Sequence, residues 1–394
     1  MNPKDSLFHP PRGNNKRVVV TGQVGLNKKP FLRKVVELAS SNGHVLRQLN
    51  IGDMMYAEAP DVVPGRILDL PLGRLNTLRR SVFKDVLAQA RGENDILVNT
   101  HATFRWKHGL FPAFDFDHML QFDADLYITL VDNLDAVHEC LDRDYNIDHS
   151  LKDIMVWREE EILATEILAS SLGKFGCFYI LARGFERDTV QSLYSLIYEP
   201  EKRKVYPSFP MTHVMDMPET LAEIDAFRDV LAEHFITFDP GDLDEKRLLI
   251  DAGDATKRGE DTITMHVSGR DVSFSVSEIT SVAGDIDGQI YARDFKLIDQ
   301  SDMIVSYVPE LPNGKPGLSS GVERELQHAH EVTKGVYVVW KPKCEPSPFI
   351  TETADEVFST VEQALDFFQR KGYIGHYQLN LVRGQAPRER GRLG

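Results

Sequence analysis

The chain has 394 residues, of which 42% are hydrophobic and 27% charged, and its formal net charge is −15. This length predicts two or three domains, and the composition argues against wholesale disorder and against a membrane protein. No apolar run approaches the roughly 18–20 residues that a membrane span needs, and the start shows no secretory pattern. The three cysteines, Cys140, Cys177 and Cys344, lie far apart, which is typical of a reducing cytoplasm and not of a disulfide framework.

The acidic balance makes the chain a poor generic binder of nucleic acid or of an anionic membrane surface. We therefore expect neither as a partner, whereas a small phosphorylated ligand stays open because a site can be locally basic. Residues 1–15 are expected to be disordered, and residues 373–394 form a basic tail rich in Gly and Arg that we also expect to be solvated.

In the first half, short β-rich runs alternate with helical patterns, which predicts a doubly wound parallel sheet of the α/β class. The predicted elements are a strand at 17–22, a helix through 31–38, strands at 95–99 and 126–131, a helix over about 150–172 and a strand at 177–181.

A polar segment with a proline at 199–204 predicts the domain boundary, which gives domains at 16–198 and 199–372. The second domain repeats the α/β rhythm and predicts a Rossmann-like parallel sheet. Its predicted elements are strands at 205–206, 236–238, 303–308 and 336–340 and helices at 219–234, 322–332 and 360–368. Residues 250–280 hold two further β-rich runs, which predict a hairpin inserted in this domain.

A glycine-containing loop, GQVGLNKK at 22–29, stands between the first strand and the first helix, which is the setting of a phosphate-binding P-loop. In such a loop, backbone N–H groups and a helix N-terminus hold phosphates and a lysine reaches the outer ones. Lys28 stands at the place of that lysine, but Asn27 replaces a glycine and Lys29 replaces the Ser or Thr that holds Mg²⁺. The candidate nucleotide-binding residues are Gly22, Gly25, Asn27, Lys28 and Lys29.

With the segments NIGDMM at 50–55 and NTHATF at 99–104, this loop makes residues 16–185 resemble the archaeal-type adenylate kinases. In that family the strand before Thr-His carries a metal-supporting aspartate, where this chain has Asn99. The family's lid carries several arginines, where 141–146 offers only Arg143. Since phosphoryl transfer depends on neutralisation of charge by metal and arginine, the resemblance with these departures implies a pseudokinase.

ATP or another nucleotide is the ligand that the loop of this pseudokinase would take. A pure scaffold and a nucleotide kinase with atypical metal handling stay open, and we expect no metal site.

In the second half, one glutamate falls on the apolar face of a predicted helix. At 100° per residue, Val322, Leu326 and Ala329 form an apolar stripe, and Glu325 lies on it. A carboxylate in that position loses hydration, which is rarely tolerated without a partner or a purpose. The alternative is a glutamate at the edge of the stripe that reaches solvent.

The surrounding pattern comprises Arg293-Asp294, a strand after Ser301-Asp302, and then Ser-x-Gly-Val-x-x-Glu-Leu-x-x-Ala from Ser319. It makes residues 203–370 resemble the nucleoside 2-deoxyribosyltransferase family, especially its hydrolytic branch, the 2′-deoxynucleoside 5′-phosphate N-hydrolases. The resemblance implies that Glu325 is the nucleophile at C1′ of the sugar and forms a covalent glycosyl-enzyme. It implies that Asp294 handles the proton of the departing base. The implied substrate-binding residues are Tyr206, Ser208, Phe209, Pro210, Ser319, Ser320 and Gly321.

Several departures concern the substrate. Phe209 stands where the family has a glycine, and Pro210 and Thr212 stand where the hydrolases have Ser and Arg, which removes one cationic phosphate contact. Ser319, where the transferases carry an aspartate nearby, favours a nucleotide over a nucleoside. We therefore expect a cytoplasmic homo-oligomer that cleaves the N-glycosidic bond of a (deoxy)nucleotide, releases the free base and needs no cofactor for that step. Base transfer and a nucleotide-sensing module without turnover are the alternatives.

Overall fold

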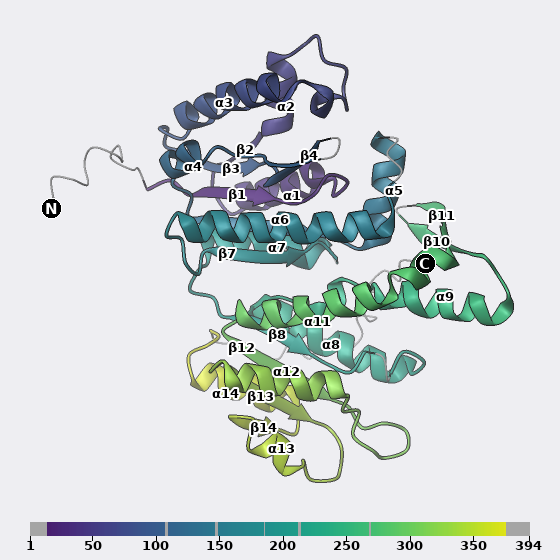
Figure 1. The fold of residues 1–394 in the computed structure, drawn as a ribbon. Coiled ribbons are helices and arrows are strands. Elements are labelled where there is room, and N and C mark those ends of the chain that lie inside the picture. The colour runs from purple at the N-terminus through teal and green to yellow at the C-terminus, as the bar shows by residue number, and fades with distance from the viewer. Residues whose placement is uncertain are drawn as a thin grey trace. The chain divides into compact units, whose positions relative to one another are not determined.

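The computed structural model describes residues 14–106, 109–145, 149–184, 186–211, 214–267 and 269–375 (Figure 1). The expectations for residues 1–13 and 376–394, and the departure at Thr212, lie outside these residues. The chain forms two compact units. Unit 1 comprises the residues up to Glu186 together with Asp251–Val282, and unit 2 comprises Arg187–Ile250 together with the residues from Ala283 on.

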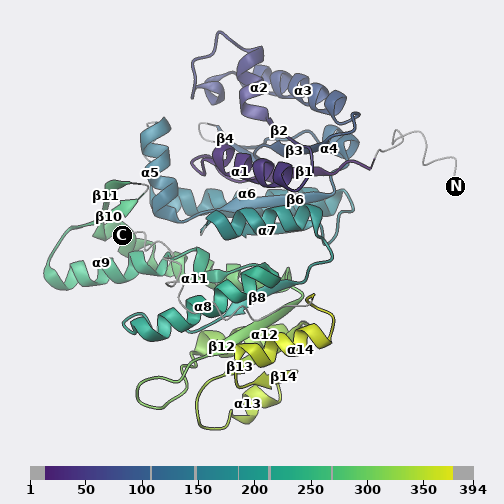
Figure 2. The same ribbon diagram turned by 180° about the vertical axis from the view of Figure 1, so that it is seen from behind.

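Unit 1 is built on a sheet of five parallel strands in the order β2-β3-β1-β6-β7. The central strand, β1, is buried at every position, and its sequence RVVVT is the near-continuous apolar run of a strand covered on both faces. Helices α1 and α6 lie on opposite faces of this sheet (Figures 1 and 2). The strands are β1 (Arg17–Thr21), β2 (Leu46–Asn50), β3 (Asp95–Asn99), β6 (Leu126–Val131) and β7 (Phe178–Ala182).

The helices of unit 1 before the insert are α1 (Lys28–Ser41), α2 (Ile51–Glu58), η1 (Ile67–Asp69), α3 (Leu72–Gln89), α4 (Phe116–Phe122), α5 (Leu134–Tyr145) and α6 (Leu151–Ser171). A small antiparallel pair, β4 (Thr103–Trp106) and β5 (Gly109–Pro112), follows β3.

Unit 2 also has five parallel strands, in the order β14-β13-β12-β8-β9. Its strands are β8 (Lys204–Ser208), β9 (Ile236–Thr237), β12 (Met303–Val308), β13 (Gly335–Trp340) and β14 (Glu356–Phe358). Its other elements are α7 (Glu186–Tyr198), α8 (Pro218–His234), η2 (Pro240–Asp242), α11 (Ala283–Asp299), α12 (Ser320–Glu331), α13 (Pro348–Thr351) and α14 (Val361–Arg370).

Counted along the chain of unit 2, the strand order is 2-1-3-4-5, so the direction of the connections reverses between β8 and β12. In open α/β sheets, ligands bind outside the carboxyl ends of the strands at this point of reversal. Helices α11 and α12 lie side by side over one face of the sheet, with α8 over the other (Figures 1 and 2). The predicted α/β class with two parallel sheets is therefore confirmed, and the topology indicates where a site in unit 2 would lie.

The division into units differs from the boundary expected near residue 199. Helix α7 belongs to unit 2, where the Ser192 hydroxyl donates a hydrogen bond to the Thr237 carbonyl of β9 (3.5 Å). The segment 251–282 carries the end of α9 (Lys246–Arg258), the antiparallel hairpin β10 (Thr262–Val267) and β11 (Arg270–Ser275), and α10 (Val276–Ser281). The hairpin was expected, but its segment belongs to unit 1.

Two contacts within unit 1 explain the place of this insert. The ring of Phe274 on β11 lies 5.1 Å from the ring of His138 on α5, measured between centroids. The Glu278 carboxylate of α10 accepts a hydrogen bond from the Leu151 N–H at the start of α6 (2.8 Å). Among the described helices, none is both long and apolar enough to cross a membrane.

Candidate functional site

Both carboxylate oxygens of Glu325 accept hydrogen bonds from side chains of β8. The Tyr206 hydroxyl donates to Oε1 (3.0 Å), and the Ser208 hydroxyl donates to Oε2 (2.6 Å). Tyr206 and Ser208 are two residues apart on a strand, so they share the face of the sheet that α12 covers. Both are fully buried, whereas Glu325 is partly buried. The glutamate on the apolar stripe therefore has two partners that fix the orientation of its carboxylate.

The second carboxyl group of the site is Asp294 on α11, which packs beside α12. Its charge acts on both Glu325 and Tyr206. Its Oδ1 is buried and has no hydrogen-bond partner among the described residues. The fold thus brings four residues that are separated in the sequence into one cluster: Tyr206, Ser208, Asp294 and Glu325. This cluster lies beside the point between β8 and β12 where the direction of the connections reverses.

The electrostatics of this cluster favour protons on the two carboxyl groups. Burial, followed by the charge of Asp294, raises the pKa of Glu325 to about 8, although the hydrogen bonds from Ser208 and Tyr206 act to lower it. Burial raises the pKa of Asp294 to about 6; the charge of Arg293 lowers this pKa and that of Glu245 raises it. Because the groups interact, they titrate as a pair, which at pH 7 holds about one proton.

The start of α12 has a clear structural role. The Ser319 hydroxyl accepts a hydrogen bond from the Val322 N–H (3.2 Å) and so caps the helix. Ser320 and Gly321 are exposed in the first turn. Capping and phosphate binding are compatible, because the N–H groups of that turn still point out of the helix end.

Phe209 and Pro210 follow the end of β8 and are both buried. The guanidinium of Arg228 lies over the Phe209 ring, 5.1 Å from its centroid. Arg228 is itself held by ion pairs to Asp239 (2.6 Å), Asp225 (3.0 Å) and Asp242 (3.7 Å). Phe209 thus packs against an arginine whose positive charge is offset by neighbouring aspartates.

Sequence reasoning gave no role to Arg228, Asp239, Glu245 or Arg293. Arg228 and Asp239 stand beside Phe227 and Phe238 in the sequence, but nothing in the local pattern pairs the two charged residues. Glu245 had no local signal either, because its partner is far away in the sequence.

In unit 1, three residues of the loop between β1 and α1 have positive φ values. Gly22 and Gly25 have φ values of 131° and 94°, and Asn27 adopts a left-handed conformation with φ 45° directly before α1. Such values suit glycine and, less well, asparagine. The predicted loop between the first strand and the first helix is therefore present.

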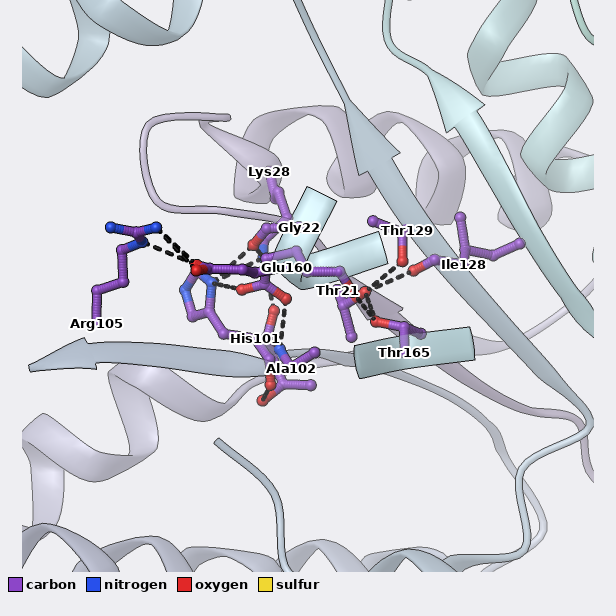
Figure 3. A network of polar contacts seen from close by, with 12 residues as sticks. Thr21, Gly22, Lys28, His101, Ala102, Arg105, Ile128, Thr129, Glu160 and Thr165 are labelled. Carbon is purple, nitrogen blue, oxygen red and sulfur yellow. Dashed lines mark hydrogen bonds and ion pairs between the residues drawn. The ribbon is translucent and has the colours of Figure 1, made fainter. Parts of the chain in front are cut away.

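The amine of Lys28 is hydrogen-bonded to backbone carbonyl groups. It donates hydrogen bonds to the carbonyls of Gly22 (2.6 Å) and Thr100 (2.6 Å), as Figure 3 shows for Gly22. Burial lowers the pKa of Lys28 to about 7, opposed by the charge of Glu161. Lys29 is exposed and pairs with Asp53.

His101 and Glu161 complete the surroundings of Lys28. Nδ1 of His101 lies 2.7 Å from the Gly22 carbonyl oxygen, which only accepts, so Nδ1 carries a proton. Burial and then the charge of Lys28 lower the pKa of His101. Glu161 is fully buried on α6 and accepts a hydrogen bond from the Ala102 N–H (2.7 Å). No cluster of three potential metal ligands occurs within the described ranges.

Side chains of α5 lie close to Gly25 of the loop. A Cβ on Gly25 would lie 2.9 Å from Cγ of Leu141 and 3.1 Å from Cγ1 of Val137. Leu26 is only 1% exposed. Arg143, the single arginine expected in the lid, pairs with Glu139 (2.7 Å).

No family model matches the chain. Among solved structures, it is similar to a shikimate kinase from Bacteroides thetaiotaomicron, with 15% sequence identity, a TM-score of 0.32 and coverage of 46% of this chain and 97% of that one. It is also similar to the tunicamycin resistance protein of Deinococcus radiodurans, with 13% identity, a TM-score of 0.26 and coverage of 40% and 96%. At these identities and TM-scores the likenesses do not bear on the activity of this chain.

Proposed function

We propose that unit 2 cleaves the N-glycosidic bond of a (deoxy)nucleotide by hydrolysis and releases the free base. The observation that carries this proposal is the Glu325 carboxylate, fixed on both oxygens by Tyr206 and Ser208 and accompanied by Asp294. Two carboxyl groups with different surroundings are the means by which glycosidic bonds are cleaved: one attacks the sugar and the other moves the proton of the leaving group.

In the proposed reaction, an oxygen of Glu325 attacks C1′ while the bond from C1′ to the base nitrogen breaks. The electron pair of that bond goes to the base, which takes a proton from Asp294. Water, deprotonated by Asp294, then attacks C1′ and releases the sugar, so both carboxyl groups return to their starting states. The reactive form has Glu325 ionised and Asp294 protonated. Because the pKa of Glu325 is the higher of the two, the one proton that the pair holds near pH 7 lies mostly on Glu325, and the reactive form is the less populated of the two singly protonated forms.

The substrate class is supported by the start of α12. Ser319, Ser320 and Gly321 stand where a helix N-terminus favours an anion such as the substrate's phosphate. Transfer of the sugar to a second base instead of to water would use the same glycosyl-enzyme and is the variant reaction of this proposal.

For unit 1 we propose nucleotide binding without phosphoryl transfer. The Ser or Thr expected to hold Mg²⁺ is replaced by Lys29, which pairs with Asp53, and the Lys28 amine is bound to carbonyls. A bound ATP or related nucleotide would then act as a regulator of unit 2. The homo-oligomer stays a prediction.

The test is release of free base, followed by chromatography, from a panel of nucleosides, nucleotides and NAD, each with and without ATP. Glu325→Gln keeps the shape of the side chain and removes the nucleophile, so we expect release to fall at least about 10³-fold. The matched control is Glu323→Gln, which removes an exposed carboxylate from the same helix turn and should leave the rate unchanged.

Base release that persists in Glu325→Gln would refute the assignment of the nucleophile. Binding of a nucleotide with no release from any member of the panel would favour the sensing module. Phosphorylation of a nucleotide that needs ATP and survives Glu325→Gln would show a working kinase in unit 1.

A further inference from the structure

A buried ion pair adjoins Asp294, and the proposed mechanism does not use it. Arg293, the residue before Asp294 on α11, donates from its guanidinium to the Glu245 carboxylate (3.0 Å). The two side chains are 5% and 0% exposed. Glu245 directly precedes α9, so the pair joins segments that lie far apart in the sequence.

Stability alone is a weak reason for this pair. Removing two charges from water costs several kcal/mol per ion, and apolar residues of the same volume often serve a fold as well. A second ion pair, Lys246 with Asp287 (2.5 Å), already links the same two segments at the surface. The buried pair therefore calls for another explanation.

The neighbouring charges supply that explanation. An unpaired arginine next to Asp294 would hold the aspartate as a carboxylate, because an opposite charge within a few ångströms favours the ionised form. The hydrogen bond that Arg293 donates goes to Glu245 instead, and Oδ1 of Asp294 is left without a hydrogen-bond partner among the described residues.

We propose that Glu245 and Arg293 are positioning residues that keep Asp294 able to carry a proton: Glu245 binds the guanidinium and so prevents Arg293 from fixing Asp294 as a carboxylate. The use of that proton for the departing base rests on the proposed function, whereas the electrostatic arrangement does not.

The groups that interact electrostatically with Asp294 come from α11, α12, β8 and the residue before α9. Glu325 on α12 and Tyr206 on β8 face it, and Arg293 and Glu245 stand beside it. Burial raises the pKa of Asp294 to about 6, the charge of Arg293 lowers it, and the charge of Glu245 raises it. The pair thus exerts two opposed influences on one carboxyl group, which a pair of substitutions can separate.

The experiment follows the Asp294 carboxyl by ¹³C NMR in the full-length protein labelled at aspartate, with Asp294→Asn to assign the signal. In Glu245→Gln the uncompensated guanidinium should lower the pKa of Asp294 by about one unit or more. In Arg293→Gln the uncompensated carboxylate should raise it. The double variant should return the pKa toward the wild-type value, and Glu245→Asp, which keeps the charge, should leave it close to that value.

A merely structural role would not produce shifts of opposite sign that cancel in the double variant. The proposal is overturned if both single variants move the pKa of Asp294 in the same direction or leave it unchanged. If Glu245→Gln does not fold, the comparison of Arg293→Gln with the double variant still decides: adding Glu245→Gln must lower the pKa.

Base release supplies a second readout. In Glu245→Gln the acid limb of its pH profile should move to lower pH by the shift that NMR measures. Absence of base release in the wild type would remove the proposed function, while the NMR shifts would still decide the role of the ion pair.

Discussion

A single residue, Glu325, shows the conflict between stability and a chemical role. Its carboxyl group has a raised pKa in the folded protein, with burial as the largest cause. A group whose pKa is raised on folding contributes stability that is present below its unfolded pKa and is lost as the pH rises toward the folded pKa. For Glu325 that window runs from about 4.5 to about 8.

We therefore expect Glu325→Gln to stabilise the protein above neutral pH. The variant has no charge to bury, so its free energy of unfolding should exceed that of the wild type by up to about 4 kcal/mol at pH 8, with a much smaller difference near pH 5. Denaturant unfolding at both pH values measures this. A difference that does not change with pH would contradict the raised pKa, and Glu323→Gln should show no such dependence.

The residues of the cluster were partly foreseeable. The helical stripe placed Glu325 on the apolar face of its helix, with a glutamate at the edge of the stripe as the alternative. Tyr206 and Ser208 were named only because the family resemblance implied them, and the predicted strand covered 205–206 alone. Their hydrogen bonds to Glu325 were not foreseeable, because nothing in the local pattern says which strand lies under which helix. The same holds for Glu245 and Arg293, which only the folded chain brings together.

At the scale of elements, the hydrophobic pattern of the sequence predicted strands best where both faces of the strand are buried. The strands at 95–99 and 126–131 were predicted with their observed bounds, since central parallel strands have continuous apolar sequences. The edge strand β2 has the sequence Leu-Arg-Gln-Leu-Asn and was not predicted. Its polar residues leave neither a continuous apolar run nor a regular alternation of apolar and polar residues. The P-loop was predicted from Gly22 and Gly25, but its packing against α5 was not.

Gly25 offers a test of that packing. Gly25→Ala should destabilise the protein, because alanine is strained at φ 94° and its Cβ would press on Leu141 and Val137 of α5. The matched control is Gly43→Ala, which has a similar φ of 85° but no atom within 4 Å of the new Cβ. The difference between the two free energies of unfolding, from denaturant titration, should be at least about 1 kcal/mol. Equal losses would mean that α5 does not press on the loop.

At the scale of the whole molecule, the sequence suggested two α/β halves but assigned the hairpin to the wrong neighbours in space. A boundary drawn from composition assumes that each domain is one continuous stretch of chain. That assumption fails here, because Phe274 contacts His138 and Glu278 accepts a hydrogen bond from Leu151. Both partners belong to the first half of the chain. Contacts at such sequence separation leave no local signal.

Phe274→Ala should therefore weaken unit 1. The ring is 2% exposed, and removing a buried phenylalanine costs about 3–5 kcal/mol. We expect amide hydrogen exchange to become faster in α5 and in β10, and to change little in α12. Phe349→Ala, at a position that is 84% exposed, is the control and should change neither. Faster exchange in α12 alone would contradict the assignment of the insert to unit 1.

The interrupted path of the chain also has a consequence for synthesis on the ribosome. Helix α5 is complete at Tyr145, but the residues that cover His138 are not made until β11, after β8, α8 and β9 of unit 2. At about 5–20 residues per second, unit 1 stays unfinished for a time of the order of ten seconds. During that interval one side of α5 is uncovered in the nascent chain, so the first unit to be started is completed only after the second has begun to form.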